Sequence, residues 1–106
     1  MSLTASMQEK VKGLLPDLMG IEFTDVTPDK VVAQLTVRKD LCTIGDNLHG
    51  GAIMAFADTL GAVAAILNMP QGSRTTTIES KTNFIGGAPL GTRITGESVP
   101  ISQSRG

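Results

Sequence analysis

The sequence contains no tryptophan, no tyrosine and only three phenylalanines, Phe23, Phe56 and Phe84. Single-stranded nucleic acids are bound by stacking bases on aromatic side chains, so this shortage argues against such a function. Lysine and arginine form no cluster, and nine basic residues against ten acidic ones give a net charge of −1. The basic patch expected of a nucleic-acid-binding protein is therefore not predicted either.

Cysteine and histidine occur once each, as Cys42 and His49. A lone cysteine cannot form a disulfide within the chain, which fits a reducing compartment, and we expect a cytoplasmic protein. We interpret Cys42 as a small packing residue. With one cysteine and one histidine no metal site is predicted. The N-terminus has no charged region followed by a long apolar core, so no secretory signal is predicted.

The 106 residues suffice for a single globular domain, with 41% hydrophobic and 18% charged residues. The longest apolar stretch, from Gly50 to Met69, contains Asp58 near its middle. An aspartate at the centre of a bilayer costs about 2.5–3.5 kcal/mol. This stretch therefore predicts a buried helix of a soluble domain, and no insertion into a membrane.

The hydrophobic pattern predicts helices and strands in a defined order. Val31, Ala33, Leu35 and Val37 alternate with more polar residues, which is typical of a strand with one buried face. The predicted elements are a helix (4–15) ended by Pro16-Asp17 and Gly20, two strands (21–26 and 31–37) joined by a turn (27–30), a loop (38–48), a helix (50 to about 68), a strand (74–84), a turn (86–89) and a strand (92–101).

The second helix is apolar nearly all round, so we expect it to be buried on all sides. Many of its side chains are small, which indicates close packing, plausibly against a curved sheet. The fold class predicted is α+β, with one central helix wrapped by antiparallel strands.

Asp58 interrupts this apolar helix and is a candidate catalytic residue. A buried carboxylate needs hydrogen-bonding partners, and such carboxylates serve as general bases. The alternative is a structural aspartate that reaches solvent or caps a neighbouring group.

His49, Gly50 and Gly51 form a second candidate site where the loop enters the helix. The free N–H groups and the dipole at a helix N-terminus can bind an anion or polarise a carbonyl. The alternative is a tight turn with an ordinary histidine. At about 1.5 Å per residue, Asp58 lies roughly two turns from Gly50. It cannot reach a carbonyl held at Gly50 of the same subunit, which suggests a site shared between subunits.

Two segments of the chain, residues 45–51 (GDNLHGG) and 58–61 (DTLG), together resemble the signature of hotdog-fold acyl-CoA thioesterases. Within these enzymes, the chain resembles the PaaI-like family, which is related to 4-hydroxybenzoyl-CoA thioesterases. Residues 77–84 (TIESKTNF) and 88–91 (APLG) resemble the next strand and turn of that family. The resemblance extends from about Leu14 to Ile101.

The resemblance implies a hotdog fold and roles for individual residues. It implies that Asp58 is the general base or nucleophile, that the Gly50 N–H polarises the thioester carbonyl, and that His49 orients the thioester. Thr77 matches a serine or threonine that helps hold the attacking water in some relatives. Asn47, Gly51 and Thr43 are the implied substrate-binding positions. Homodimers or homotetramers with sites at the dimer interface are implied, with no cofactor except the coenzyme A of the substrate.

Two departures from the family pattern affect these expectations. Many relatives carry Asn or Gln six residues before the histidine, where this chain has the shorter Thr43. Relatives also continue for two long strands that lie inside the sheet. We therefore expect a hotdog domain (1–106) that is incomplete at its C-terminus and has unpaired strand edges.

Three functions are consistent with the sequence. The first is hydrolysis of aryl- or medium-chain acyl-CoA to the free acid and coenzyme A. The second is a hotdog module that binds acyl-CoA or an acyl carrier without cleaving it. The third is a hydratase of the same fold, although the Asp/His arrangement usual in those enzymes is not found on the central helix.

Overall fold

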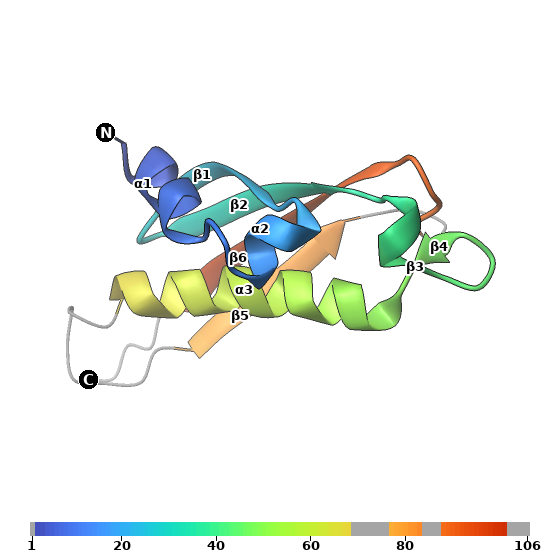
Figure 1. The fold of residues 1–106 in the computed structure, drawn as a ribbon. Helices are drawn as coiled ribbons and strands as arrows, with labels where there is room; N and C mark the ends of the chain where they lie inside the picture. The colour runs from blue at the N-terminus through green and yellow to red at the C-terminus, as the bar shows by residue number, and fades with distance from the viewer. Residues whose placement is uncertain (1, 69–76, 84–87, 102–106) are drawn as a thin grey trace.

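The structure is a computed structural model that describes residues 2–68, 77–83 and 88–101, with only the backbone of 77–83 and 101. Figure 1 shows the helices and strands in their order along the chain. They are α1 (Leu3–Lys10), α2 (Leu15–Met19), β1 (Glu22–Thr27), β2 (Lys30–Thr36), the 3-10 helix η1 (Lys39–Leu41), β3 (Cys42–Thr43), β4 (Asn47–Leu48), α3 (Gly50–Asn68), β5 (Thr77–Asn83) and β6 (Arg93–Ile101).

The main sheet has four antiparallel strands in the order β1-β2-β6-β5. Figure 1 shows α3 lying across one face of this sheet, and it contacts β2, β5 and β6. This arrangement confirms the predicted α+β architecture of a long helix against an antiparallel sheet. β5 and β6 pair directly with each other, and β5 is the outermost strand, with no further strand beside it among the described residues.

The core lies between α3 and the inner face of the sheet. Val31, Ala33 and Leu35 of β2 are fully buried, as their alternation predicted. Phe56 and Leu60 are also fully buried, on the side of α3 that faces the sheet. The adjacent strand β6 contributes buried residues to the same core, namely Ile94, Gly96 and Ser98.

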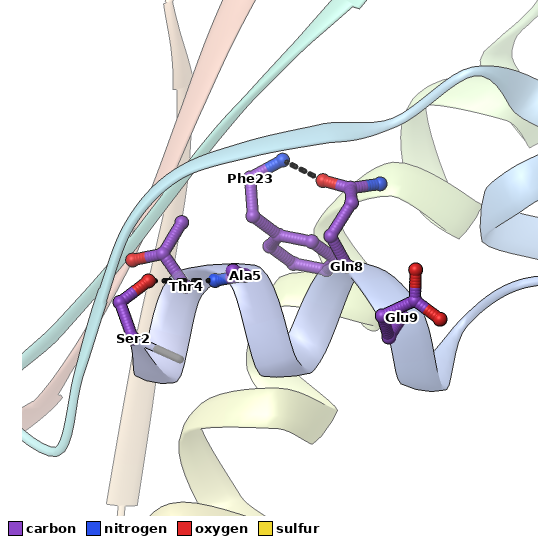
Figure 2. A pocket seen from close by; sticks show the side chains of 6 residues that line it. All are labelled: Ser2, Thr4, Ala5, Gln8, Glu9 and Phe23. Atoms are coloured by element: carbon purple, nitrogen blue, oxygen red, sulfur yellow. Dashed lines mark hydrogen bonds between the residues drawn. The ribbon is translucent and has the colours of Figure 1, made fainter.

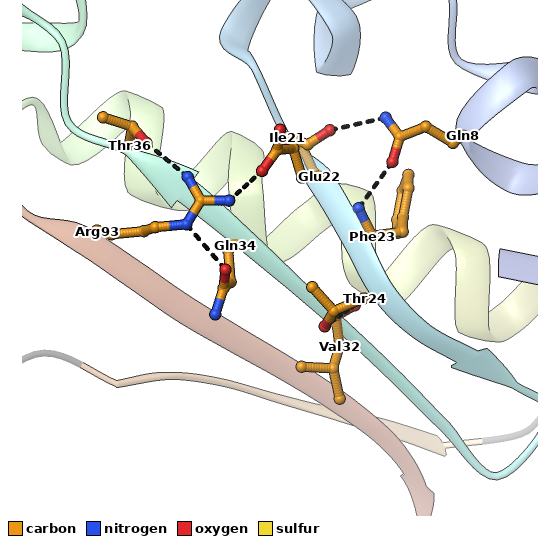
Figure 3. A network of polar contacts seen from close by, with 9 residues as sticks. All are labelled: Gln8, Ile21, Glu22, Phe23, Thr24, Val32, Gln34, Thr36 and Arg93. Atoms are coloured by element: carbon orange, nitrogen blue, oxygen red, sulfur yellow. Dashed lines mark hydrogen bonds and ion pairs between the residues drawn. The ribbon is translucent and has the colours of Figure 1, made fainter. Parts of the chain in front are cut away.

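The opposite face of the sheet is polar and open to solvent. Arg93 of β6 donates to Gln34 and Thr36 of β2 and forms an ion pair with Glu22 of β1, as Figure 3 shows. The side chain of Thr24 on the same face is also exposed. One buried and one wet face is the ordinary state of an antiparallel sheet.

The first helix covers the outer edge of β1. The Gln8 side chain donates to the carbonyl of Ile21 (3.0 Å) and accepts from the N–H of Phe23 (2.8 Å) (Figure 3). Thr4 Oγ1 accepts from the N–H of Val26 at 3.0 Å. These contacts take the place that a further strand would occupy beside β1.

The predicted N-terminal helix 4–15 is wrong in its second half. The chain leaves α1 at Val11 and turns at Gly13, whose φ is +79°. Pro16 then lies in the first turn of α2 instead of ending a helix. A proline fits there because the first N–H groups of a helix have no intrahelical partner. Gly20 does end α2, with a left-handed φ of 81°.

The prediction for α3 is right in its bounds and wrong in its burial. The helix spans Gly50–Asn68, but a stripe of residues four apart faces solvent: Met54, Asp58, Ala62 and Ile66. Met54 is 73% exposed and Ile66 57% exposed. By length and composition α3 could cross a membrane, with 22% of its most apolar part buried. Within this chain, the sheet therefore covers one face of α3 only.

The remaining strand predictions hold where they can be compared. β1, β2 and β6 match the predicted strands, and β5 lies inside the predicted segment 74–84. Positions 74–76 and 84, and the first two residues of the predicted turn 86–89, fall outside the described residues. The loop 38–48 contains the short elements η1, β3 and β4, which the hydrophobic pattern did not predict.

Candidate functional site

A tight hairpin precedes α3 and carries two of the predicted substrate-binding residues. Thr43 of β3 pairs with Asn47 of β4, and the N–H of Asp46 donates to the Thr43 carbonyl at 3.1 Å. Gly45 and Asp46 both have positive φ, +96° and 59°. Such backbone favours Gly, Asn and Asp, which explains why the Gly-Asp-Asn sequence folds into this turn.

The hairpin is fixed to the rest of the fold on several sides. Leu48 N–H donates to the Ala88 carbonyl, and Leu90 N–H donates to the Asp46 carbonyl, both at 2.8 Å. The Asp46 carboxylate accepts from Lys39 Nζ at 3.0 Å. The backbone of His49 is held as well, because its N–H donates to the Leu41 carbonyl at 2.9 Å. The entry to α3 is therefore anchored at defined points.

His49 caps the N-terminus of α3 with both its backbone and its side chain. Its carbonyl accepts from Ala52 (2.9 Å) and Ile53 (3.1 Å). Its Nδ1 accepts from the N–H of Gly51 at 2.8 Å. A side-chain acceptor for the second N–H of a helix is what an N-cap residue supplies. The side chain of His49 is exposed.

The N–H of Gly50 is the open donor of this helix end. Among the described residues, no atom accepts a hydrogen bond from the Gly50 N–H. A Cβ built on Gly50 would meet nothing within 4 Å, and the residue is exposed. An unpaired, accessible N–H at the positive end of a helix can polarise a carbonyl or bind an anion.

Asp58 is exposed on α3, so of the two alternatives the aspartate that reaches solvent is right and the buried carboxylate is wrong. The reason is its position on the solvent-facing stripe of the helix. Eight residues separate it from Gly50, so the two lie about 12 Å apart along the helix axis. The structure thus supports the argument that Asp58 does not act on a carbonyl bound at Gly50 of the same chain.

Five of the other predicted site residues lie together at one end of α3, and the sixth, Thr77, lies in β5. Thr43, Asn47, His49, Gly50 and Gly51 are brought together at the N-terminal end of α3, and all five are exposed. Asn47 Nδ2 donates to the Gly45 carbonyl at 3.3 Å, so this side chain supports the turn. The backbone of Thr77 pairs with Ile101 at one end of β5, and its side chain lies outside the description.

The sequence analysis did not single out Gly96 or Lys39. A Cβ on Gly96 would lie 2.7 Å from Leu60 Cδ1 and 2.9 Å from Phe56 Cε2, so this glycine lets α3 approach the sheet. A glycine inside a predicted strand is the signal that would have found it. Lys39 offers no such signal, because its partner Asp46 becomes a neighbour only through the hairpin. Among the described residues, no group of three or more His, Cys, Asp and Glu could hold a metal ion.

A shallow hollow beside α1 lies at the other end of the molecule from β3 and β4 (Figures 1 and 2). It is lined by Ser2, Thr4, Ala5, Gln8, Glu9 and Phe23. Most of its polar side chains already have structural partners: Ser2 caps α1, and Gln8 binds the edge of β1. We therefore place the candidate site at the N-terminal end of α3.

A long helix packed on an antiparallel sheet, with a glycine-lined N-terminus beside a tight hairpin, is the arrangement of a hotdog domain. Residues 45–105 match the sequence profile of the thioesterase superfamily, which is more than half of the chain. The chain belongs to this superfamily. Both the predicted hotdog fold and the predicted family are thereby confirmed.

Solved structures of similar fold agree with this assignment. Thioesterase HI1161 from Haemophilus influenzae has a TM-score of 0.75 at 21% identity, over 99% of this chain and 73% of that chain. AziG of S. sahachiroi has a TM-score of 0.67 at 28% identity, over 88% and 75%. A variant of the phenylacetic acid degradation protein PaaI from Thermus thermophilus has a TM-score of 0.64 at 22% identity, over 85% and 75%.

Among curated proteins, Rv1847 of Mycobacterium tuberculosis, which is named as an inferred esterase, is 29% identical over 90 residues. The match covers 82% of this chain and 64% of that protein. The chain thus spans less than two thirds of the length of this relative.

Proposed function

We propose that this protein hydrolyses acyl-CoA thioesters, with aryl- or medium-chain acyl groups as substrates. The observation that carries the proposal is the N–H of Gly50 at the exposed N-terminus of α3, which has no hydrogen-bond acceptor among the described residues. A donor of this kind is suited to the oxygen of a thioester carbonyl as negative charge develops on it. Membership of the thioesterase superfamily supports the same reaction.

In the proposed mechanism the substrate carbonyl accepts a hydrogen bond from Gly50 N–H. A carboxylate then either attacks the carbonyl carbon or removes a proton from an attacking water. When the carboxylate acts as base, the thioester C–S bond breaks, the water oxygen becomes part of the free acid, and the proton taken from the water passes to the sulfur of coenzyme A. When the carboxylate attacks directly, the sulfur leaves and takes a proton from solvent, and a water then hydrolyses the acyl anhydride to the free acid. Thr77 is proposed to help hold the water, and Asn47, Gly51 and Thr43 to line the substrate site.

Asp58 is the carboxylate that we assign to this step, acting from a second copy of the chain. The axial separation of about 12 Å within one helix rules out the carbonyl held by the same chain. On a partner copy, the exposed stripe of α3 would carry Asp58 to the neighbouring helix end. We therefore propose a homodimer, alone or within a tetramer. We also propose that the protein is located in the cytoplasm, because a single cysteine fits a reducing compartment.

The direct test is thiol release from a panel of acyl-CoA substrates by the wild type and Asp58→Asn. The amide cannot act as base or nucleophile, so we expect kcat/KM to fall at least about 10²-fold. Asp29→Asn is the matched control, because Asp29 is an exposed aspartate in the turn between β1 and β2. We expect this control to keep wild-type activity. Full turnover by Asp58→Asn would refute the mechanism.

Thr43 motivates the second candidate, a module that binds acyl-CoA or an acyl carrier without cleaving it. Its side chain is shorter than the Asn or Gln of many relatives and lies on the hairpin next to the α3 N-terminus. Isothermal titration with an intact acyl-CoA distinguishes the two. Binding without thiol release in the same sample would favour the binding module over the enzyme.

A further inference from the structure

The contact between Gly51 and His49 has a chemical consequence for the imidazole ring. The donor is a backbone N–H, so His49 Nδ1 must accept, at 2.8 Å, with its lone pair. A ring nitrogen that accepts carries no proton, and in neutral histidine the other nitrogen then carries it. The ring is thereby held with Nε2 as an N–H donor.

The outer nitrogen is free to act on a ligand. Within the described part of the chain, His49 Nε2 makes no hydrogen bond, and the side chain is exposed beside Gly50. Two donors, Gly50 N–H and His49 Nε2–H, thus belong to consecutive residues at this helix end. A thioester can accept at its carbonyl oxygen, which gives both donors an acceptor.

Gly51 is required for this geometry by its backbone and by its lack of a side chain. A Cβ at this position would lie 3.0 Å from His49 Nδ1 and 3.2 Å from Cε1. Both distances are shorter than ordinary van der Waals contact, so an alanine would require the ring to shift by a few tenths of an ångström. A Cβ at Gly50 would meet nothing within 4 Å. The lack of a side chain therefore matters for the position of the His49 ring at Gly51 and not at Gly50.

We propose that Gly51 is a positioning residue, whose N–H locks His49 as the neutral Nε2–H tautomer so that His49 donates to the bound thioester. The donation to a thioester depends on the proposed function. The locked tautomer does not, and it can be tested without any substrate.

The first experiment is NMR of the full chain labelled with ¹⁵N, at about pH 8, where an ordinary imidazole is neutral. The chain has one histidine, so the ring signals need no assignment. We expect a protonated Nε2, an unprotonated Nδ1 and a scalar coupling from Nδ1 to the Gly51 amide nitrogen across the hydrogen bond. A proton on Nδ1, or two exchanging tautomers without that coupling, would overturn the proposal.

Gly51→Ala and Gly50→Ala are the matched variants. In each, the scalar coupling between His49 Nδ1 and the amide nitrogen of residue 51 is measured. We expect the coupling to be smaller in Gly51→Ala and unchanged in Gly50→Ala, because only the first introduces a Cβ against the ring. An unchanged coupling in Gly51→Ala would show that the glycine is not needed for position.

The second experiment separates the helix cap from the donor. Asn is also a good N-cap residue, so His49→Asn keeps an acceptor for the Gly51 N–H but removes Nε2–H. We expect an unchanged Tm and a fall in kcat/KM of about 10²-fold, the usual effect of losing one donor to a developing oxyanion. Wild-type kcat/KM in His49→Asn would refute the donor role of His49. If the wild type releases no thiol from any acyl-CoA, the function fails while the NMR result still decides the tautomer.

Discussion

Gly96 is the residue on which the close packing of α3 against the sheet depends. It lies in β6, and the nearest atoms to a Cβ built there belong to Leu60 and Phe56, at 2.7 and 2.9 Å. Both side chains are fully buried, so neither can move into solvent. The glycine is thus explained by tertiary contact, since its φ is not in the left-handed region.

We predict that Gly96→Ala lowers the free energy of unfolding by about 1–3 kcal/mol, as overpacking of a core does. Urea denaturation measures it. Thr95→Val serves as the control, because Thr95 is a neighbour in β6 on the outer face and valine keeps the β-branched shape. Its effect should stay within about 0.5 kcal/mol. Equal stability of the two variants would contradict the packing argument.

At the scale of elements, α1 protects the outer edge of β1. The amide of Gln8 binds a carbonyl and an N–H of that edge, and Thr4 binds the N–H of Val26. Exposed strand edges invite pairing with other chains. A helix whose side chains occupy the edge removes this risk for β1.

We predict that Gln8→Ala destabilises the protein by about 1–2 kcal/mol, because two partly buried backbone groups lose their partner. Amide hydrogen exchange at Phe23 should accelerate. Gln8→Glu keeps the acceptor for Phe23 N–H and loses the donor to Ile21, so its exchange at Phe23 should be slower than in Gln8→Ala. Glu9→Gln, on the exposed side of α1, is the control without effect. Unaltered exchange in Gln8→Ala would show that the edge is closed by other means.

For the whole molecule, the exposed stripe on α3 is the feature that a single chain does not explain. Met54, Ala62 and Ile66 expose apolar side chains on both sides of Asp58. In the proposed dimer this stripe would face a second copy, and each site would combine His49 and Gly50 of one chain with Asp58 of the other.

We predict that two inactive variants restore activity when mixed. In a dimer formed from His49→Ala and Asp58→Asn chains, one of the two shared sites has both residues intact. Random exchange of subunits should therefore recover about a quarter of wild-type thiol release. Each variant alone is the control. Exchange of subunits demonstrated by native mass spectrometry, with no recovered activity, would contradict a shared site, and so would a monomeric protein.

The local features of the fold follow from the sequence. The alternation of Val31 to Val37 predicted β2, and the apolar run after Gly50-Gly51 predicted α3 with its bounds. Both signals arise from contacts that recur at fixed spacing, so they can be read along the chain. The break at Gly13 was missed because Pro16 was interpreted as the end of a helix, although proline is equally suited to a first turn.

The candidate site was predicted in part. His49 to Gly51 and Asp58 are candidates from their types and spacing, and the sequence left open whether Asp58 is buried or reaches solvent. The hydrophobic pattern predicts that Asp58 lies in an apolar helix, but it does not predict which faces of that helix are covered by other elements. The hydrogen bond from Gly51 to His49 Nδ1 was likewise outside the reach of the pattern, because it depends on a side-chain rotamer.

The sequence by itself determined the order of the long strands and of α3, the bounds of α3 and the glycine-lined start of that helix, because local spacing and backbone freedom control these. The tertiary structure alone decided which face of α3 meets the sheet and why Gly96 must lack a side chain. These depend on atoms that are distant in the chain and become neighbours only when helix and sheet pack together.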